Sequence, residues 1–311
     1  MTDVLRVGTR GSALALAQSG TVARRLADAA GGTAELIRIR TQGDVNLGPL
    51  ASIGGTGVFV TEVRSRLVAG DVDVVVHSLK DLPTSDAPGI ALAAVPVRED
   101  PADALCARDG LTLDTLPPGA TVGTGSPRRA AQLLRHRPDL DVRPIRGNID
   151  TRLSLVGAGS LDAIVLAAAG LARIGRTGAM SQRLGPELML PAPAQGALAV
   201  ECKVGDAENA WYSAALQDLD DSDTRWAVTA ERSLLAALEA GCTAPVGAFA
   251  TVSGADLTMT GAVIATDGSR EIRGTVTGPA HRAEQLGRDL AARLISDGAA
   301  ALLSVGSAAD R

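Results

Sequence analysis

Over its first two thirds, the chain alternates short β-branched runs, turns rich in Gly, Ser or Thr, and segments rich in Ala, Leu and Arg. The hydrophobic runs predict strands at 4–7, 36–40, 72–77, 91–96, 120–123, 142–145 and 163–168. The intervening segments predict helices near 13–29, 60–69, 127–136, 151–156 and 210–217. This alternation predicts an α/β protein with parallel sheets covered by helices.

Two proline-broken segments interrupt this pattern, "VREDPAD" at 97–103 and "LPAPAQG" at 190–196. Two such crossings predict that one domain is inserted into another and that they act as a hinge. After about residue 218 the pattern changes to a helix ending in "LLAALEAG", a strand meander with a turn at Asp267–Gly268, and an amphipathic helix near 280–297. This last part predicts a small α+β domain.

Composition narrows the possible functions. The 311 residues are 46% hydrophobic, enough for packed cores, and carry a net charge of −5 with only 2% aromatic residues, which argues against nucleic acid as a partner. The N-terminus lacks the pattern of a secretion signal, and the apolar run 163–172 is too short to cross a membrane, so a cytoplasmic protein is expected. Cys106, Cys202 and Cys242 lack the spacing of a disulfide framework or a zinc site, so no metal is expected.

Ligands of open parallel sheets bind beyond the carboxyl ends of the strands, and polar clusters occur there. In "VGTRGSALALAQ", Arg10 can bind a carboxylate and Ser12 can cap the next helix. A plain helix cap with a solvated arginine explains this segment equally well.

The segment "VGTGSPRRAAQLL" places Ser126 at an N-cap and Pro127 at the first helical position, with Thr124, Arg128 and Arg129 beside them. "PIRGNIDTRLSLV" directs Arg146 and Arg152 toward the same edge, and residues 124–152 hold seven arginines against three aspartates. We therefore predict a ligand with several carboxylates or phosphates, the alternative being solvated arginines on helix surfaces. Phosphate is less favoured because neither a P-loop nor a complete G-x-G-x-x-G motif is present.

In "VVVHSLKDLPTS", a buried strand leads into Ser78, Lys80 and Asp81. Asp81, facing a cluster of arginines, is predicted to stay ionised and to stabilise a cation or transfer a proton. The alternative is an ion pair between Lys80 and Asp81 on the surface.

Cys242 follows a helix end in "LEAGCTAPVG", where the helix dipole disfavours a thiolate, so a reaction there needs a very reactive electrophile.

Nine segments, in order and spacing, resemble the porphobilinogen deaminase (hydroxymethylbilane synthase) family: "GTRGSALALAQ", "HSLKDLPT", "REDPADAL", "GTGSPRRAAQL", "RGNIDTRL", "LAAAGLARIG", "PAPAQGALAVEC", "TAERSLL" and "GCTAPVGAFA". The resemblance implies two doubly wound lobes like type II periplasmic binding proteins, plus a small α+β C-terminal domain. Domain 1 would comprise 1–98 and 197–215, the inserted domain 2 would comprise 102–192, and domain 3, carrying the cofactor cysteine, 218–311.

The same resemblance implies a transferase that condenses four porphobilinogen molecules head to tail into hydroxymethylbilane, releasing ammonia, on a covalent dipyrromethane primer. Asp81 matches the catalytic aspartate, which stabilises an azafulvenium cation. By this resemblance, the residues that bind the cofactor are Cys242, through a thioether, and Lys80, Ser78, Ser126, Thr124, Arg128, Arg129 and Arg146. Substrate binding falls to Arg10, Ser12, Arg152, Arg173 and Gln195. One departure is that Thr56 and Thr61 stand where many relatives carry lysines.

The family also implies a monomer that passes its product to uroporphyrinogen-III synthase. Two other readings stay open. One is a non-enzymatic anion-binding protein of the same two-lobed architecture. The other is a thiol-dependent transferase with Cys242 as nucleophile and His77 as base.

Overall fold

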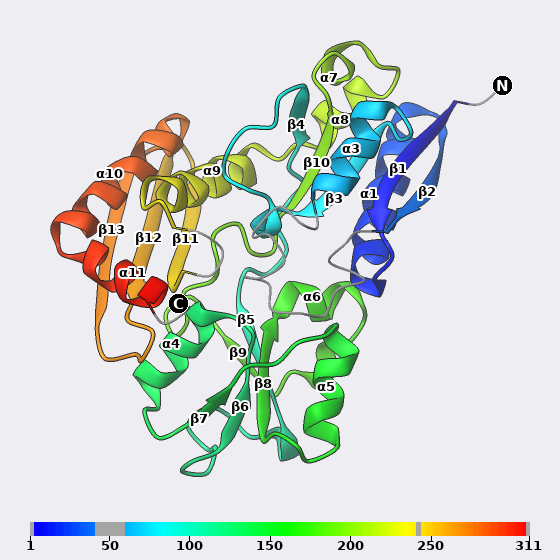
Figure 1. The fold of residues 1–311 in the computed structure, drawn as a ribbon. Helices are drawn as coiled ribbons and strands as arrows, with labels where there is room; N and C mark the ends of the chain where they lie inside the picture. Colours follow the sequence, from blue (N-terminus) through cyan, green and yellow to red (C-terminus); the bar gives the residue numbers. More distant parts are fainter. Residues whose placement is uncertain (1–2, 41–59, 241–243, 309–311) are drawn as a thin grey trace. The chain divides into compact units, whose positions relative to one another are not determined.

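The computed structural model (Figure 1) describes residues 3–40, 60–240 and 244–308. Contacts divide the chain into two compact units, each described by itself. Unit 1 is Met1–Arg98 with Ala197–Arg225, and unit 2 is Glu99–Gly196 with Trp226–Arg311.

Unit 1 is an α/β sandwich around one five-stranded sheet, in the order β2-β1-β3-β10-β4. Its elements are β1 (Val4–Arg10), α1 (Ala13–Ala30), β2 (Thr33–Ile39), α3 (Thr61–Ala69), β3 (Val74–Ser78), the 3₁₀ turn Leu79–Asp81, β4 (Ile90–Ala94), β10 (Leu198–Lys203), α7 (Asp206–Asn209) and α8 (Ser213–Leu219). Strands β1, β2 and β3 are parallel, whereas β10 runs antiparallel to both β3 and β4.

The valines of β3 show why helices cover both faces of this sheet. Side chains alternate along a strand, so Val74 and Val76 pack on the face covered by α1 and α8. Val75, on the opposite face, packs against Val63 and Leu67 of α3. Each fully buried aliphatic side chain contributes about 1.5–3 kcal/mol, which makes this strand a rigid base for the turn that follows it.

Unit 2 contains a second five-stranded sheet, in the order β7-β6-β8-β5-β9. Its elements up to residue 196 are β5 (Asp103–Ala107), the 3₁₀ turn Arg108–Gly110, β6 (Thr121–Gly123), α4 (Pro127–His136), β7 (Asp141–Arg143), α5 (Ile149–Gly157), β8 (Ala163–Ala167), α6 (Ala168–Arg173), the 3₁₀ turn Thr177–Ala179 and β9 (Gln182–Leu184). Strands β6, β7 and β8 are parallel, and β5 is antiparallel to β8 and β9. Separate hydrophobic clusters lie on the two faces, one including Leu133 of α4 and the other Leu171 of α6.

The rest of unit 2 is an antiparallel three-stranded sheet with helices, as predicted (Figure 1). Its elements are α9 (Ser222–Ala237), which begins in unit 1, β11 (Val246–Ser253), β12 (Asp256–Ile264), β13 (Glu271–Pro279), the 3₁₀ turn Ala280–Arg282, α10 (Ala283–Ser296) and α11 (Ala299–Ala308). Residues of α9 and α10 pack with the sheet in one core. Gly268, with φ 75°, makes the predicted turn between β12 and β13. An ion pair of 3.1 Å from Arg135 Nε to Glu271 Oε2 joins α4 to β13.

The α/β class with two doubly wound sheets is confirmed, and each predicted element occurs within a few residues of its place. The predicted parallel pairing holds for β1, β2 and β3 and for β6, β7 and β8, whereas β10 and β5 run antiparallel to their neighbours. Both strands, and β9, were missed because they follow the proline-rich crossings or lie outside the β-branched runs that served as the signal. The three domain boundaries stay predictions. No helix in the described ranges is long and apolar enough to span a bilayer.

Candidate active site

One edge of the second five-stranded sheet collects most of the predicted arginines, and we call it the arginine edge. It is the edge where β6, β7 and β8 end and where the antiparallel β5 begins, since Asp103 pairs with Ala167. The turns that follow these strands carry Thr124, Ser126, Arg128 and Arg129 after β6, Arg146 after β7 and Arg173 after β8 through α6. The prediction that strand-end turns converge here is therefore met within unit 2.

Arg128 and Arg129, in the first turn of α4, share a single buried carboxylate. Arg128 Nη1 donates to Asp103 Oδ2 at 2.8 Å, and Arg129 Nε donates to Asp103 Oδ1 at 2.9 Å. Arg128 is 3% exposed, Arg129 is 6% exposed and Asp103 is 0% exposed. Burial alone would raise the pKa of Asp103, but the charges of both arginines outweigh it and hold that pKa far below its ordinary value.

Sequence reasoning assigned no role to Asp103, although "REDPADAL" was among the matching segments. Asp103 opens a strand that runs antiparallel to β8, so it does not lie at the carboxyl end of a strand, where ligands of parallel sheets are expected. A lone aspartate before an apolar run, "DALCA", was the available signal.

One N–H group of Arg128, at Nε, has no acceptor among the described residues. Its Nη1 also donates to the Leu190 carbonyl at 2.6 Å, but its buried Nε has no hydrogen-bond partner among the described residues. Burial lowers the pKa of Arg128, while Asp103 opposes that shift. An unsatisfied buried guanidinium N–H costs free energy, so the geometry favours an added anion.

Arg146 and Arg152 extend the positive region. The pKa of Arg152 is lowered, first by burial and then by the charges of Arg129 and Arg146, so its guanidinium group lies within electrostatic reach of both. Arg152 Nε donates to the Gly147 carbonyl at 2.8 Å, which holds its side chain at the start of α5.

Thr124 and Ser126 lie where α4 begins. Ser126 occupies the predicted N-cap position before Pro127, but its side chain makes no capping hydrogen bond. Its backbone N–H instead donates to Thr124 Oγ1 at 3.2 Å. The Ser126 hydroxyl is thus not used to cap the helix.

Gln195 and Arg173 approach the edge from two other segments. Gln195 is fully buried, and its Nε2 donates to Asp103 Oδ1 at 2.9 Å and to the Pro101 carbonyl at 2.8 Å. Arg173 Nη2 donates to the Gly196 carbonyl at 2.6 Å. Burial lowers the pKa of Arg173, with Glu99 opposing.

The other predicted residues lie in unit 1, where β1 and β3 end side by side as parallel neighbours. Arg10 ends β1, and Ser12 caps α1 by accepting a hydrogen bond from the Ala15 N–H at 3.2 Å, which confirms its capping role. Ser78 ends β3, and Lys80 and Asp81 form the 3₁₀ turn directly after it. Asp81 is exposed at this turn.

His77 is a buried residue of β3 beside a carboxylate of β10. It is 8% exposed, and its Nε2 lies 3.4 Å from Glu201 Oε2 without a hydrogen bond. Arg64 donates to the same carboxylate from Nε at 3.0 Å and Nη2 at 2.6 Å. His77 is thus part of the packed interior between β3 and β10.

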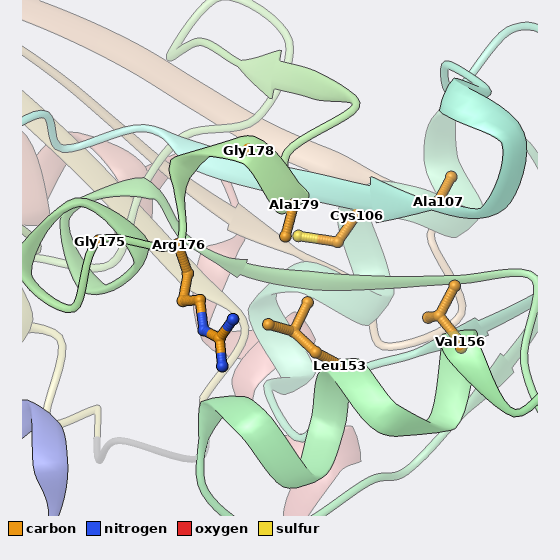
Figure 2. A pocket seen from close by; sticks show the side chains of 9 residues that line it. Cys106, Ala107, Leu153, Val156, Gly175, Arg176, Gly178 and Ala179 are labelled. Carbon is orange, nitrogen blue, oxygen red and sulfur yellow. The ribbon is translucent and has the colours of Figure 1, made fainter.

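Cys242 and Thr56 lie outside the described residues, whereas Thr61 begins α3. A pocket of about 390 Å³ in unit 2 contains none of the predicted site residues. Figure 2 shows Cys106, Leu153 and Ala179 around it, with Arg176 beside them. Burial raises the pKa of Cys106 to about 11, so its thiol stays protonated near neutrality.

Comparisons with known proteins agree over nearly the whole chain. A family model described as "Porphobilinogen deaminase, dipyromethane cofactor binding domain" matches residues 5–210, and one for the "Porphobilinogen deaminase, C-terminal domain" matches residues 226–296. Porphobilinogen deaminase of Mycobacterium avium is 54% identical over 310 residues, covering 97% of each chain. That of Mycobacterium tuberculosis is 53% identical over 309 residues, covering 96% of this chain and 98% of the relative.

Solved structures give more distant likenesses. A periplasmic substrate-binding protein of an ABC transporter from Coxiella burnetii is 14% identical, with a TM-score of 0.44, covering 69% of this chain and 91% of that one. The L-cystine solute receptor of Neisseria gonorrhoeae is 16% identical, with a TM-score of 0.40, covering 70% of this chain and 86% of that one. The two family models and the relatives, rather than these structures, decide the assignment: the chain belongs to the porphobilinogen deaminase family.

Proposed function

We propose that this chain is a transferase that condenses four porphobilinogen molecules head to tail into hydroxymethylbilane, releasing one ammonia for each molecule added. The observation that carries the proposal is the arginine edge, where the buried Arg128 and Arg129 share one carboxylate and Arg128 Nε has no acceptor among the residues that the structure describes. Porphobilinogen has an acetate and a propionate on its pyrrole ring, so a growing chain is a polyanion that suits such a surface.

The arginines bind these carboxylates and orient the rings. Charge-assisted pairs between guanidinium and carboxylate are directional and often bidentate. At 4 Å and an effective dielectric near 20, each pair gains about 4 kcal/mol of Coulomb energy before desolvation is subtracted. Several such pairs are needed to retain a long anion while each new unit is added.

Asp81 is the proposed catalytic residue. During each addition, the C–N bond of the aminomethyl group breaks, ammonia leaves with the electron pair, and positive charge develops on the pyrrole ring of porphobilinogen. An exposed carboxylate at the end of a rigid strand can accept a hydrogen bond from the pyrrole N–H and stabilise that charge.

The residues present fit a dipyrromethane cofactor, because an orphaned buried donor and a cluster of arginines match its carboxylates. We assign its binding to Cys242, through a thioether, and to Ser78, Lys80, Thr124, Ser126, Arg128, Arg129 and Arg146. When bound, this group supplies the nucleophilic pyrrole carbon from which the chain grows. The hydroxyl of Ser126 is available for such a role because it does not cap α4.

We assign substrate binding to Arg10, Ser12, Arg152, Arg173 and Gln195. Arg152 and Arg173 fit this role because burial disfavours their charged forms, and an incoming carboxylate would offset that cost. Gln195 would act with Asp103, to which its amide donates. We further propose a cytoplasmic monomer whose product passes to uroporphyrinogen-III synthase.

Intact-protein mass spectrometry tests the proposal. Protein purified after exposure to porphobilinogen is expected to carry the mass of two pyrrole units on the peptide that contains Cys242, and to release ammonia when given more substrate. Cys242→Ser should lose both, whereas the control Cys202→Ser, a buried thiol in β10, should keep both. An unmodified chain that binds porphobilinogen without releasing ammonia would point to the non-enzymatic anion-binding alternative.

A further inference from the structure

Asp103 has no assigned part in binding or chemistry, yet it is the most enclosed charged group of the arginine edge. It is 0% exposed at the first position of β5. Both of its oxygens are used, Oδ2 by Arg128 and Oδ1 by Arg129 and by the amide of Gln195. One carboxylate thus spans two guanidinium groups from consecutive residues.

The way Asp103 binds Arg128 determines which donors of that arginine stay free. Arg128 Nη1 makes both described hydrogen bonds, one to Asp103 Oδ2 at 2.8 Å and one to the Leu190 carbonyl at 2.6 Å. The Nε–Nη2 side of the guanidinium makes no hydrogen bond within the described part of the chain, and Nε is fully enclosed. Nε–H and one Nη2–H point in parallel and form the fork that binds a carboxylate through two hydrogen bonds.

Arg129 is held differently and leaves no such fork. Its Nε donates to Asp103 Oδ1 at 2.9 Å, and its Nη2 lies 2.8 Å from the same oxygen. Its Nη1 donates to the Val165 carbonyl at 3.0 Å. Asp103 therefore occupies the fork of Arg129 while sparing that of Arg128.

The charges of these three groups lead to the same conclusion. Two guanidinium groups and one carboxylate leave one uncompensated positive charge in a region that is at least nine-tenths buried. A buried uncompensated charge is costly, so one further carboxylate would complete the cluster. With a neutral residue at position 103, two positive charges would be left unbalanced, and each arginine would keep only its hydrogen bonds to uncharged groups.

We propose that Asp103 is a positioning residue that presents the Nε–Nη2 fork of Arg128 to one carboxylate of the covalently attached pyrrole primer. Resting on the function proposed above, this inference identifies the group that makes the cofactor site selective for a single carboxylate at this point. Asp103 touches neither substrate nor cofactor, and it acts through Arg128.

The test compares Asp103→Asn with Asp100→Asn, whose side chain pairs with Arg183 through a partly exposed contact only three residues away. Apoprotein of each variant is incubated with porphobilinogen, and the covalently loaded fraction is followed by intact mass. Asn keeps the shape of Asp103 but turns an N–H group toward one arginine. Loading of D103N is expected to be at least tenfold slower than wild type, and the rise in Tm between apoprotein and loaded protein should shrink, while D100N behaves as wild type.

Arg128→Lys in the presence of Asp103 is the second variant, since it keeps the charge but removes the fork. It should load as slowly as D103N, and the double variant should be no slower than either single one, because both act through the same fork. The inference would be overturned if R128K loaded as fast as wild type. It would also be overturned if D103N lowered the Tm of the apoprotein but loaded normally. If wild type itself acquires no mass, the proposed function fails, which is a result distinct from these.

Discussion

Glu201 of β10 accepts two hydrogen bonds from Arg64 of α3, at 3.0 Å from Nε and 2.6 Å from Nη2, inside unit 1. The Glu201 side chain is 4% exposed and that of Arg64 18%. Strand β10 lies beside β3, which leads directly into Ser78, Lys80 and Asp81. The pair therefore ties a helix to the strands that support the proposed catalytic turn.

This pair predicts an acid-dependent contribution to stability. Burial would raise the pKa of Glu201, but the adjacent His77 and the hydrogen bonds and charge of Arg64 lower it from 4.5 to about 2. A carboxylate with a lowered folded-state pKa stabilises the fold above its unfolded pKa and loses that contribution as pH falls through the folded value. Glu201→Gln should thus cost on the order of 3 kcal/mol at pH 7, and the difference from wild type should shrink between about pH 4.5 and 2.

Denaturant unfolding at a series of pH values measures this difference. The control is Glu284→Gln, which removes an exposed ion pair with Arg288 on one helix face. Such pairs contribute about 0.3–0.5 kcal/mol, so this variant should stay close to wild type throughout. A Glu201→Gln variant that is equally destabilised at pH 7 and pH 2.5 would show that its effect is packing rather than charge.

Asp81 and His77 should respond to mutation in opposite ways. Asp81→Ala removes an exposed group at a strand end, so stability should hardly change while kcat falls by about 10²–10⁴-fold, the usual size of acid–base and electrostatic roles. His77→Ala removes a buried ring beside Glu201, so it should cost about 1 kcal/mol of stability while leaving substantial activity. Porphobilinogen consumption and Tm, measured on both variants, separate the two effects. The reverse ordering of activities would favour the thiol-dependent transferase with His77 as base.

How far the sequence could predict the fold is illustrated by β3 and β5. The three consecutive valines of β3 and the Gly and Pro residues around it identify a buried strand, and the structure has Ser78 at its carboxyl end and Lys80 and Asp81 in the turn that follows. Strand β5, "DALCA", has no β-branched residue and follows a proline, so no local signal revealed it. Its antiparallel direction depends on how distant segments pair, which a pattern of nearby residues does not contain.

The same limit applies to the site. The residue types and spacing predicted arginines in the turns after β6 and β7, and the charges of Arg129 and Arg146 do reach Arg152, whose pKa they lower. The pattern did not indicate that Arg128 and Arg129 are buried, because charged residues in a first helical turn are usually solvated. Their burial depends on Asp103, which lies 25 residues earlier in the chain than Arg128.

The thiols of Cys106 and Cys202 should be unreactive in the native protein. Burial is the main cause that raises the pKa of each to about 11, from 9.0. At pH 8 only about one thiol in a thousand is then ionised, and alkylation requires the thiolate. Iodoacetamide should label neither residue until the protein is denatured, as peptide mass mapping can measure.

Under the proposed function, Cys242 should be labelled in the apoprotein and protected after loading. Rapid native labelling of Cys106 would mean that the pocket beside it opens in solution.

Gly196 should be intolerant of any side chain, because two independent features require glycine there. Its φ is 90°, and a Cβ would lie 2.4 Å from the Glu99 carbonyl oxygen. Gly196→Ala must therefore move the segment that carries Gln195 and the carbonyl to which Arg173 donates. We expect a loss of about 2–4 kcal/mol in unfolding free energy, with slower loading of the primer, since strain and displacement act together. Gly205→Ala is the matched control, because its φ of −68° suits any residue and no atom lies near its Cβ. Equal stability of the two variants, measured by urea unfolding, would show that the segment around Gly196 relaxes freely and does not hold Gln195 in place.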